Sequence, residues 1–256
     1  MILTGKEIVK QVKEGNIFIE GFDENKANPN SYNLTLNNKL LVYTSNILDM
    51  KHQNNTTEIT IPEEGLVLQQ GTLYLGKTNE RTFTDKYVPM LEGRSSIGRL
   101  GIYIHVTAGF GDIGFNGNWT LEIQCVQPVR IYPNVDICQI YYHTPEGDTS
   151  IQYDGKYQGD TEIGSSKLYE DFNEGLTADE KLDKFFTAWC DNIHASKYNA
   201  KSDVSDKMLM ICRAHRKAVE DTGIDDDDLT IKCIHKFKND EVKEIALLWF
   251  NHILIK

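Results

Sequence analysis

The run EGRSSIGRLGIYIHVTAGFGDIGFNGNWTLE, residues 92–122, is the most informative part of this sequence. It opens with a glycine-flanked turn at residues 93–99, continues through alternating polar and apolar positions, and crosses a glycine-rich loop that contains Asp112. It ends in a second strand-like stretch that carries Glu122. Guanidinium and hydroxyl groups can donate to phosphate oxygens, and a carboxyl group can transfer protons. The run therefore predicts a site for a phosphorylated ligand, although such a turn alone is weak evidence.

Short strand-like segments surround this run on both sides. Two of them, residues 31–36 and 40–43, are separated by Asn37-Asn38 and predict a hairpin. Many short strands with turn residues between them predict a mainly β fold, a barrel or a sandwich. The expected strands cover residues 17–19, 31–36, 40–43, 58–61, 66–68, 72–76, 87–91, 119–126, 129–132 and 136–142.

Helical patterns occur at the two ends of the chain. Thr4 and Glu7 have the spacing of a capping box and predict a helix over residues 5–14. Residues 150–172 are polar and glycine-rich, and form either a plain linker or a mobile arm that closes over a site. We expect a first domain at residues 1–172 and a small α-helical domain at residues 173–256. The helices expected in the second domain cover residues 177–193, 205–221 and 240–255.

Composition and charge exclude several classes of protein. The formal net charge of −11 leaves no basic face for sequence-independent binding, so we expect no nucleic-acid partner. No apolar run approaches the roughly 20 residues of a membrane span, and the amino terminus shows no secretory signal. We therefore expect no membrane association and a cytoplasmic location. The five cysteines include no CxxC pair, which argues against a disulfide framework or a structural zinc site.

Several motifs of nucleotide chemistry are absent from the sequence. There is no GxxxxGK[ST] phosphate loop and no GxGxxG after a strand. The zinc nucleobase deaminases need H-x-E and P-C-x-x-C, and neither His105 nor His194 begins such a pattern. The sequence therefore predicts no zinc. We expect His105 to be a strand residue that shapes the pocket or the core of a trimer, because no metal partners accompany it.

Residues 93–122 resemble the corresponding run of the dCTP deaminases, a family of the trimeric dUTPase-like superfamily. Three further pieces agree in order: NSYNLTL at residues 30–36, LGKTNE at residues 75–80 and YDGKYQ at residues 153–158. The resemblance covers residues 1–172. It implies a distorted β-barrel or jelly-roll subunit and a homotrimer with active sites between subunits. It also implies dCTP or dUTP as ligand, Mg²⁺ bound with the triphosphate, and deamination without zinc.

The resemblance also assigns roles to individual residues. Glu122 matches the catalytic acid–base, which would activate the water that attacks C4 of cytosine and protonate N3 and the departing ammonia. Arg99 matches the arginine that orients this carboxylate, and Asp112 matches the carboxylate that faces the 3′-hydroxyl of the deoxyribose. The implied catalytic set is Glu122, Arg99 and Ser95. The implied ligand contacts are Arg94, Ser95, Ser96, Ile97, Gly98, Arg99, Asp112, Thr120, Leu121, Glu122, Gln139, Tyr153 and Lys156.

Two features keep alternatives open. Asp160 stands where the family often carries Gln, which would weaken recognition of the base. TAGF at residues 107–110 resembles the bifunctional members, which hydrolyse dUTP to dUMP and pyrophosphate, because a small loop leaves space for a water at the α-phosphate. We expect a deaminase that converts dCTP to dUTP and ammonia. The alternatives are a bifunctional dCTP deaminase–dUTPase, a dUTPase only, and a non-catalytic nucleotide-sensing module. The sequence assigns no role to residues 173–256.

Overall fold

The chain divides into two compact units in the computed structural model. The first unit comprises Met1–Thr44 and Asn55–Ser165, and the second comprises Ser45–Asn54 and Ser166–Lys256. The domain boundary expected after residue 172 stays a prediction. None of the helices in the described residues is long and apolar enough to cross a membrane. The structure describes residues 1–45, 47–105, 108–172, 175–178, 180–182, 218–219, 222–224, 243 and 247.

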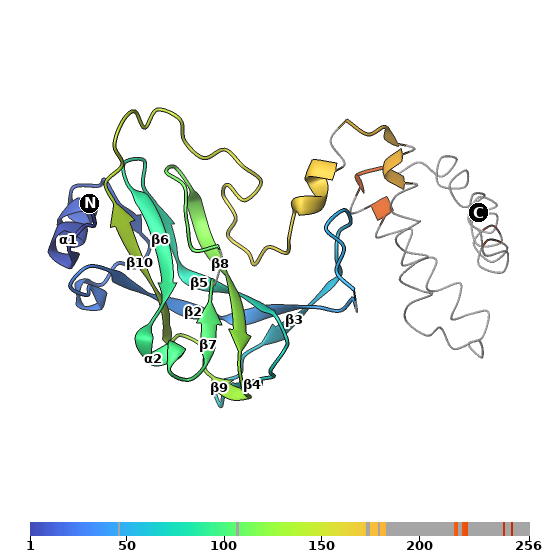
Figure 1. Ribbon diagram of the computed structural model, residues 1–256, viewed down its shortest axis with the longest axis horizontal. Helices are drawn as coiled ribbons and strands as arrows, with labels where there is room; N and C mark the ends of the chain where they lie inside the picture. Colours follow the sequence, from blue (N-terminus) through green and yellow to red (C-terminus); the bar gives the residue numbers. More distant parts are fainter. Residues whose placement is uncertain are drawn as a thin grey trace. The chain divides into compact units, whose positions relative to one another are not determined.

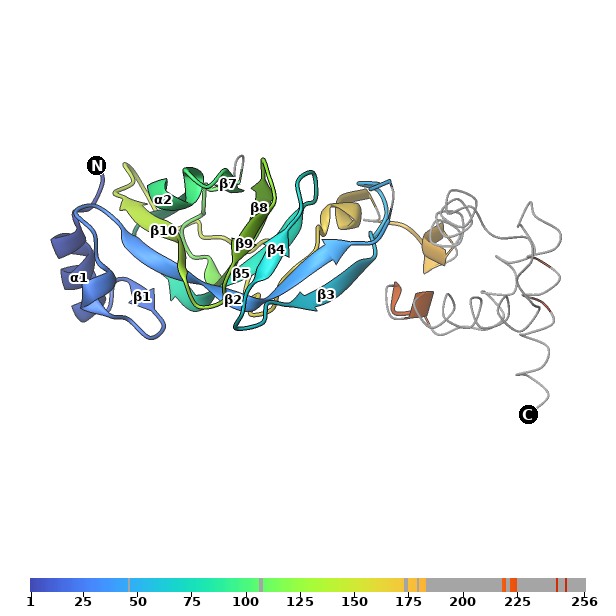
Figure 2. The same ribbon diagram turned by 90° about the horizontal axis from the view of Figure 1, so that it is seen from below.

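An eight-stranded antiparallel sheet builds the first unit (Figure 1). Six strands follow the order β6-β10-β2-β5-β8-β7, while β1 pairs with β5 and β3 pairs with β2. Figure 2 shows β2 and β3 running side by side as a long ribbon. The strands of this sheet are β1 (Phe18–Ile19), β2 (Tyr32–Tyr43), β3 (Thr56–Thr60), β5 (Tyr74–Phe83), β6 (Val88–Gly93), β7 (Ile102–Ile104), β8 (Asn116–Cys125) and β10 (Asp136–His143).

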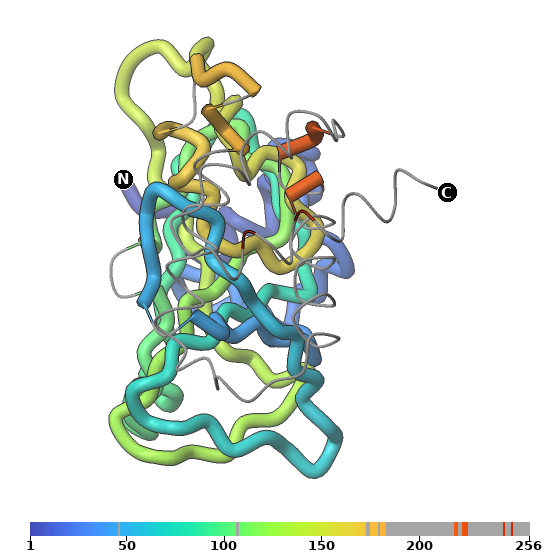
Figure 3. The backbone as a smooth tube through the Cα atoms, turned by 90° about the vertical axis from the view of Figure 1, so that its right-hand side faces the viewer, coloured from blue at the N-terminus to red at the C-terminus, as the bar shows by residue number. Residues whose placement is uncertain are grey.

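The sheet curls into a nearly closed barrel. Its edge strands β6 and β7 approach each other, since a Cβ on Gly93 would lie 3.8 Å from Cβ of Ile104. A second, two-stranded sheet pairs β4 (Leu66–Leu68) with β9 (Val129–Ile131). Figure 3 shows these two segments, in cyan and yellow-green, side by side. The expected mainly β, barrel-like fold is confirmed.

The strand β8 shows how the sequence pattern becomes a two-faced strand. Its alternate residues Leu121, Ile123 and Cys125 are buried in the core, while Thr120 and Glu122 are only half-buried on the other face. Successive side chains of a strand point to opposite faces, so the alternation fixes which residues meet the core. The strand therefore carries a carboxylate and a hydroxyl away from the apolar interior.

Two cysteines belong to this core as free thiols. Cys125 and Cys138 are both buried and form no disulfide, as expected. Burial raises the pKa of the Cys138 thiol, so this side chain stays neutral at physiological pH. The other three cysteines lie outside the described residues.

The helix α1 (Gly5–Lys13) begins where the capping box predicts. Oγ1 of Thr4 accepts a hydrogen bond from the Glu7 backbone N–H at 3.3 Å. The start of the helix packs closely against a turn at residues 28–30. The Gly5 N–H donates to O of Pro29 at 2.8 Å, and a Cβ on Gly5 would lie 1.8 Å from O of Asn28. The first residue of α1 therefore has to lack a side chain.

The hairpin expected at residues 31–43 is wrong. These residues form one strand, β2, and Asn37-Asn38 produces a register shift against β5 instead of a turn. Oδ1 of Asn37 accepts from the Lys39 N–H at 3.1 Å, and Nδ2 of Asn37 donates to Oδ1 of Asn79 at 2.8 Å. Because its side chain finds partners within the sheet, the chain continues without reversing direction.

The helices expected at residues 177–193, 205–221 and 240–255 lie largely outside the described residues. The start of the first can be checked. The Thr177 N–H donates to Oε2 of Glu180 at 2.9 Å, and the Glu180 N–H donates to Oγ1 of Thr177 at 3.3 Å. These two bonds form a capping box, so the expected start of this helix is confirmed. Two short 3₁₀ helices, η1 (Glu24–Lys26) and η2 (Leu168–Phe172), and one short α-helix, α2 (Ser95–Gly98), complete the described elements.

Candidate active site

Glu122 is in close contact with a buried histidine. Its Oε2 lies 2.5 Å from Nδ1 of His105, and the two side chains are 39% and 4% exposed. Both ring nitrogens of His105 lack a hydrogen-bond partner among the described residues, so this is a close contact and not a hydrogen bond. A half-buried carboxylate beside an imidazole is suited to proton transfer.

The backbone brings His105 to this position. Ile104 pairs with Ile123 across β7 and β8, and the His105 N–H donates to O of Glu122 at 3.3 Å. His105 itself lies outside the strand, with a φ of +49° that is uncommon for a residue other than glycine. The expectation of a strand residue is thus wrong. A contact with Glu122 was not predicted, because the register of β7 against β8 is not visible in the sequence.

The predicted phosphate turn folds as the helix α2, directly after β6. The Gly98 N–H donates to O of Arg94 at 2.9 Å, and the Arg99 N–H donates to O of Ser95 at 3.1 Å. Ser95 and Ser96 are exposed, so their hydroxyl groups lie at the surface. Hydroxyl and backbone donors on a fixed turn can bind the oxygens of an anion.

Three predicted residues differ in what they can offer a ligand. Arg99 is exposed, and no hydrogen bond or ion pair connects it to Glu122 within the described chain. Ile97 packs against the hydrophobic core from the edge. Leu121 is fully buried, so only its main chain is available to a ligand.

Arg94 and Gln139 are held by polar side chains of neighbouring strands. Nη1 of Arg94 donates to O of Asp136 at 3.1 Å and lies 3.5 Å from its Oδ2. Oε1 of Gln139 accepts from Oγ of Ser31 at 2.9 Å. Neither Asp136 nor Ser31 was predicted, because only the pairing of β10 with β2 and β6 brings them beside the predicted residues.

The loop that contains Asp112 meets the segment around Tyr153. Asp112 is exposed, and the Tyr153 N–H donates to O of Ile113 at 2.8 Å. The ring of Tyr153 packs edge-on against Phe115, with centroids 5.9 Å apart. Lys156 follows three residues later and is half-buried. The structure therefore brings the expected sugar reader close to the expected arm.

Residues 151–165, which we call the arm, lie along β8. The Asn118 N–H donates to O of Asp160 at 2.8 Å, and the Gly159 N–H donates to O of Asn116 at 3.1 Å. Further along, the Gly164 N–H donates to Oγ1 of Thr120 at 3.3 Å. Of the two interpretations left open by the sequence, a linker or an arm, these contacts favour an arm. It follows β8 toward the residue two positions before Glu122.

Within one chain the predicted residues form three groups. Glu122 and Thr120 lie on β8, Arg94 and Gln139 lie around β10, and Asp112 lies beside the arm. No hydrogen bond or ion pair among the described residues joins the first group to the second. The described part of the chain also contains no group of three or more His, Cys, Asp or Glu that could hold a metal ion. The absence of zinc and the binding of Mg²⁺ with the nucleotide stay predictions.

The first unit is a nearly closed barrel with a hydroxyl- and arginine-bearing turn after β6 and a carboxylate on β8. A family model described as dCTP deaminase-like matches residues 2–144. The chain belongs to the dCTP deaminase-like family, as the resemblance in the sequence implied.

Similar proteins carry more specific names. The chain is 64% identical over 174 residues to a "dCTP deaminase, dUMP-forming" of Clostridium beijerinckii, which covers 68% of this chain and 100% of that protein. A protein of the same name from Cytophaga hutchinsonii is 59% identical, with the same coverage. The solved structure of a 2′-deoxycytidine 5′-triphosphate deaminase from Agrobacterium tumefaciens is 19% identical, with a TM-score of 0.46. It covers 56% of this chain and 48% of its own.

Proposed function

We propose that this protein is a dCTP deaminase that forms dUMP, so that it removes ammonia from dCTP and then pyrophosphate from the resulting uracil nucleotide. The main support for this proposal is the carboxylate of Glu122 on β8, which is in close contact with His105. The chain that carries it is 64% identical to a protein named for this reaction. The names of the relatives favour the bifunctional alternative over a deaminase that stops at dUTP. Glu122, His105 and the small loop after His105 are the features that support it.

Glu122 is the proposed proton carrier for deamination. Its carboxylate takes a proton from water as the water oxygen attacks C4 of cytosine, and delivers a proton to N3 of the ring. The hydroxyl proton then passes to the exocyclic amine, which leaves as ammonia, and the ring becomes uracil. A single positioned carboxyl can carry out both transfers. His105 holds this carboxylate in place through the 2.5 Å contact.

The proposed phosphate contacts are the donors of the α2 turn together with Arg94. The chain has a net charge of −11, so a polyanionic ligand needs such local donors. Mg²⁺, when bound by the triphosphate, would neutralise part of its charge. Because Arg94 and Glu122 are not joined within one chain, we propose that the site is completed between subunits of a homotrimer. Arg99 would then reach Glu122 from a neighbouring subunit.

The substitution Glu122→Gln tests the proton carrier. We expect it to lower the rate of ammonia release from dCTP by at least about 100-fold, because the amide cannot take a proton from water. Binding of dCTP, measured by calorimetry, should persist, since the amide has nearly the same shape. Ammonia release at the wild-type rate would remove Glu122 from this role.

Product analysis of the wild-type protein separates the candidate functions. dCTP and dUTP are supplied in separate reactions, and ammonia, dUTP, dUMP and pyrophosphate are resolved. The proposed function predicts ammonia from dCTP, and dUMP and pyrophosphate from either substrate. Accumulation of dUTP would indicate a deaminase only, and dUMP from dUTP without ammonia from dCTP would indicate a dUTPase only. No product from either nucleotide would favour the non-catalytic module.

A further inference from the structure

Arg94 is the predicted phosphate ligand with the most complete support from its own chain. Its Nη1 donates to the main-chain oxygen of Asp136 at 3.1 Å and is 3.5 Å from the carboxylate oxygen Oδ2. Both contacts use the same nitrogen. Among the described residues, Nε and Nη2 have no partner. The guanidinium is therefore held at one corner, and the remaining donors are left for a ligand.

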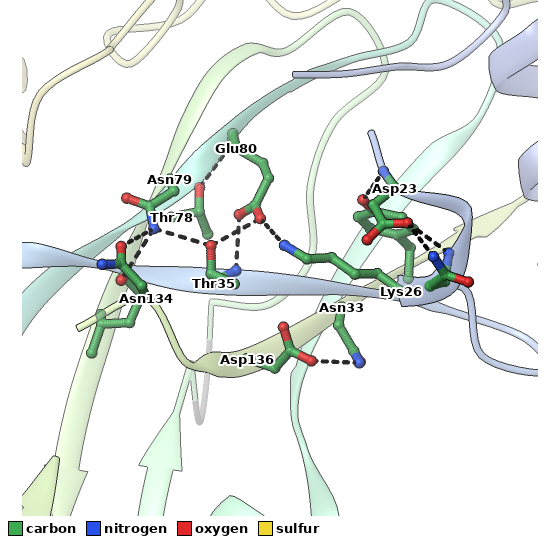
Figure 4. A network of polar contacts seen from close by, with 12 residues as sticks. Asp23, Lys26, Asn33, Thr35, Thr78, Asn79, Glu80, Asn134 and Asp136 are labelled. Carbon is green, nitrogen blue, oxygen red and sulfur yellow. Dashed lines mark hydrogen bonds and ion pairs between the residues drawn. The ribbon is translucent and has the colours of Figure 1, made fainter. Parts of the chain in front are cut away.

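Asp136 is itself held by a buried amide. Nδ2 of Asn33 donates to Oδ2 of Asp136 at 3.0 Å, and the residue Asn33 is only 6% exposed (Figure 4). Oδ1 of Asn33 in turn accepts from Nδ2 of Asn28 at 2.8 Å. Each side chain in this series therefore orients the one after it, from Asn28 through Asn33 and Asp136 to the guanidinium of Arg94. Such series strengthen one another in a site of low polarity.

A second branch starts from the same asparagine. Nδ2 of Asn28 also donates to Oγ of Ser31 at 3.2 Å, and Ser31 donates to Oε1 of Gln139 at 2.9 Å. Ser31 is 4% exposed, so this branch is also shielded from water. The two predicted ligand residues Arg94 and Gln139 are thus tied to one amide group. The last contact of each branch crosses to β10, from Asn33 to Asp136 and from Ser31 to Gln139, so these two contacts position side chains and do not merely complete a turn.

We propose that Asp136 is a positioning residue that fixes the guanidinium of Arg94 for the phosphates of the nucleotide, and that Asn33 fixes Asp136. This inference rests on the proposed function, because it takes a nucleotide triphosphate as the ligand. An arginine side chain loses rotamer freedom when it is immobilised. Asp136 restricts the side chain before the ligand binds, so less rotamer freedom is lost on binding. It also leaves the other edge of the guanidinium open for bidentate contact with a phosphate.

The test compares dCTP turnover by Asp136→Asn, Arg94→Ala and the double variant. Asparagine keeps one side-chain oxygen for Asn33 and the main-chain oxygen for Arg94, so the substitution removes the charge and replaces the other carboxylate oxygen by an amide nitrogen. We expect the KM for dCTP to rise about tenfold, the effect of losing one charge-assisted contact, with kcat within about twofold. In the Arg94→Ala background the same substitution should change KM by less than about twofold, because Asp136 acts through Arg94.

The test includes a control variant and a replacement variant. Glu58→Gln removes a carboxylate from an exposed ion pair with Lys39, and should leave KM unchanged. If Asp136→Asn does not fold, as judged by thermal unfolding, Asn33→Ser replaces it, with an expected rise in KM of about threefold that is also lost in the Arg94→Ala background.

Two kinds of failure are distinguishable. An unchanged or lowered KM for Asp136→Asn in an active protein would overturn the inference and leave the proposed function intact. Effects that add to those of Arg94→Ala would also overturn it. A wild-type protein that acts on neither dCTP nor dUTP would refute the proposed function and the inference together.

Discussion

Glu80 is a buried carboxylate in a polar network between β2 and β5 (Figure 4). Its Oε2 accepts from the Thr35 N–H at 2.8 Å, and its Oε1 accepts from Nζ of Lys26 at 2.8 Å and from Oγ1 of Thr35 at 2.9 Å. Burial alone would lower the pKa of Lys26, but the hydrogen bond and the charge of Glu80 raise it above its ordinary value. The carboxylate is therefore satisfied on both oxygens.

Replacing Glu80 by Gln should destabilise the fold. The amide leaves the ammonium of Lys26 half-shielded without a counter-charge, and breaking a buried pair costs about 3 kcal/mol or more. We expect the free energy of unfolding, measured in urea, to fall by about this amount. Glu58→Gln breaks an exposed pair of similar length and should cost at most about 1 kcal/mol. Equal effects of the two substitutions would contradict a structural role for the Glu80 network.

Tyr142 presents the opposite case, a buried hydroxyl that has no partner among the described residues. An unsatisfied polar group costs free energy when it is removed from water. Tyr142→Phe removes the hydroxyl and keeps the ring, so we expect the free energy of unfolding to rise by about 1 kcal/mol at neutral pH. Urea unfolding of the purified variant measures this. A loss of stability would show that the hydroxyl has a partner in the assembled protein.

The same residue affects stability at alkaline pH. Burial raises the pKa of Tyr142 above the value of 10.0 that the unfolded chain would have. Above pH 10 the unfolded state therefore loses its phenolic proton first, which favours unfolding, and the stability is lost as the pH rises toward the folded pKa. Tyr32, whose pKa burial also raises, acts in the same direction. Tyr142→Phe should make this decline shallower.

At the scale of elements, one side chain, that of Gln158, adds to the backbone contacts that hold the arm. Oε1 of Gln158 accepts from the Asn116 N–H at 2.9 Å, and its Nε2 donates to O of Gly114 and to O of Tyr153, each at 2.8 Å. Two of these contacts join the arm to Gly114 and to Asn116 at the start of β8, and the third joins two residues of the arm itself.

Gln158→Ala should release the arm from β8. We expect faster hydrogen exchange at the amide of Asn116 and faster cleavage by trypsin after Lys156, because local opening costs less free energy. Gln124→Ala, on the exposed face of the same strand, is the matched control and should change neither. Unchanged exchange at Asn116 in the Gln158 variant would show that the backbone contacts alone hold the arm.

The elements also show what the sequence could and could not predict. Alternation of polar and apolar residues located β8 and β10 within a few residues, because burial of one face imposes that pattern. The same reasoning divided β2 into two strands, because Asn37-Asn38 resembles a turn until its partners across the sheet are known. Register was not predictable, and the partners of Glu122 and Arg94 depend on it. The contact of His105 with Glu122 and the contact of Asp136 with Arg94 were therefore missed, while the roles that the family motif assigns stay predictions.

At the scale of the whole molecule, the relatives end where the deaminase-like part ends. The Clostridium beijerinckii protein is matched over its full length by 68% of this chain, so the remaining third has no counterpart in it. A shortened protein that ends at Phe172 should keep its rate of dCTP turnover within about twofold, because that length is sufficient in the relatives. Activity and oligomeric state of the two lengths are compared directly. A different oligomeric state in the shortened protein would give the extension a role in assembly.

The contact between Gly5 and the 28–30 turn limits which substitutions are tolerated at position 5. Any side chain at Gly5 would displace O of Asn28, since a Cβ there would lie at 1.8 Å. Asn28 supports both branches that end at Arg94 and Gln139. A substitution of Gly5, at the start of α1, would therefore weaken ligand binding. Position 5 excludes the other amino acids for a local steric reason, while the effect of a substitution there would reach Arg94 and Gln139 through the hydrogen bonds of Asn28.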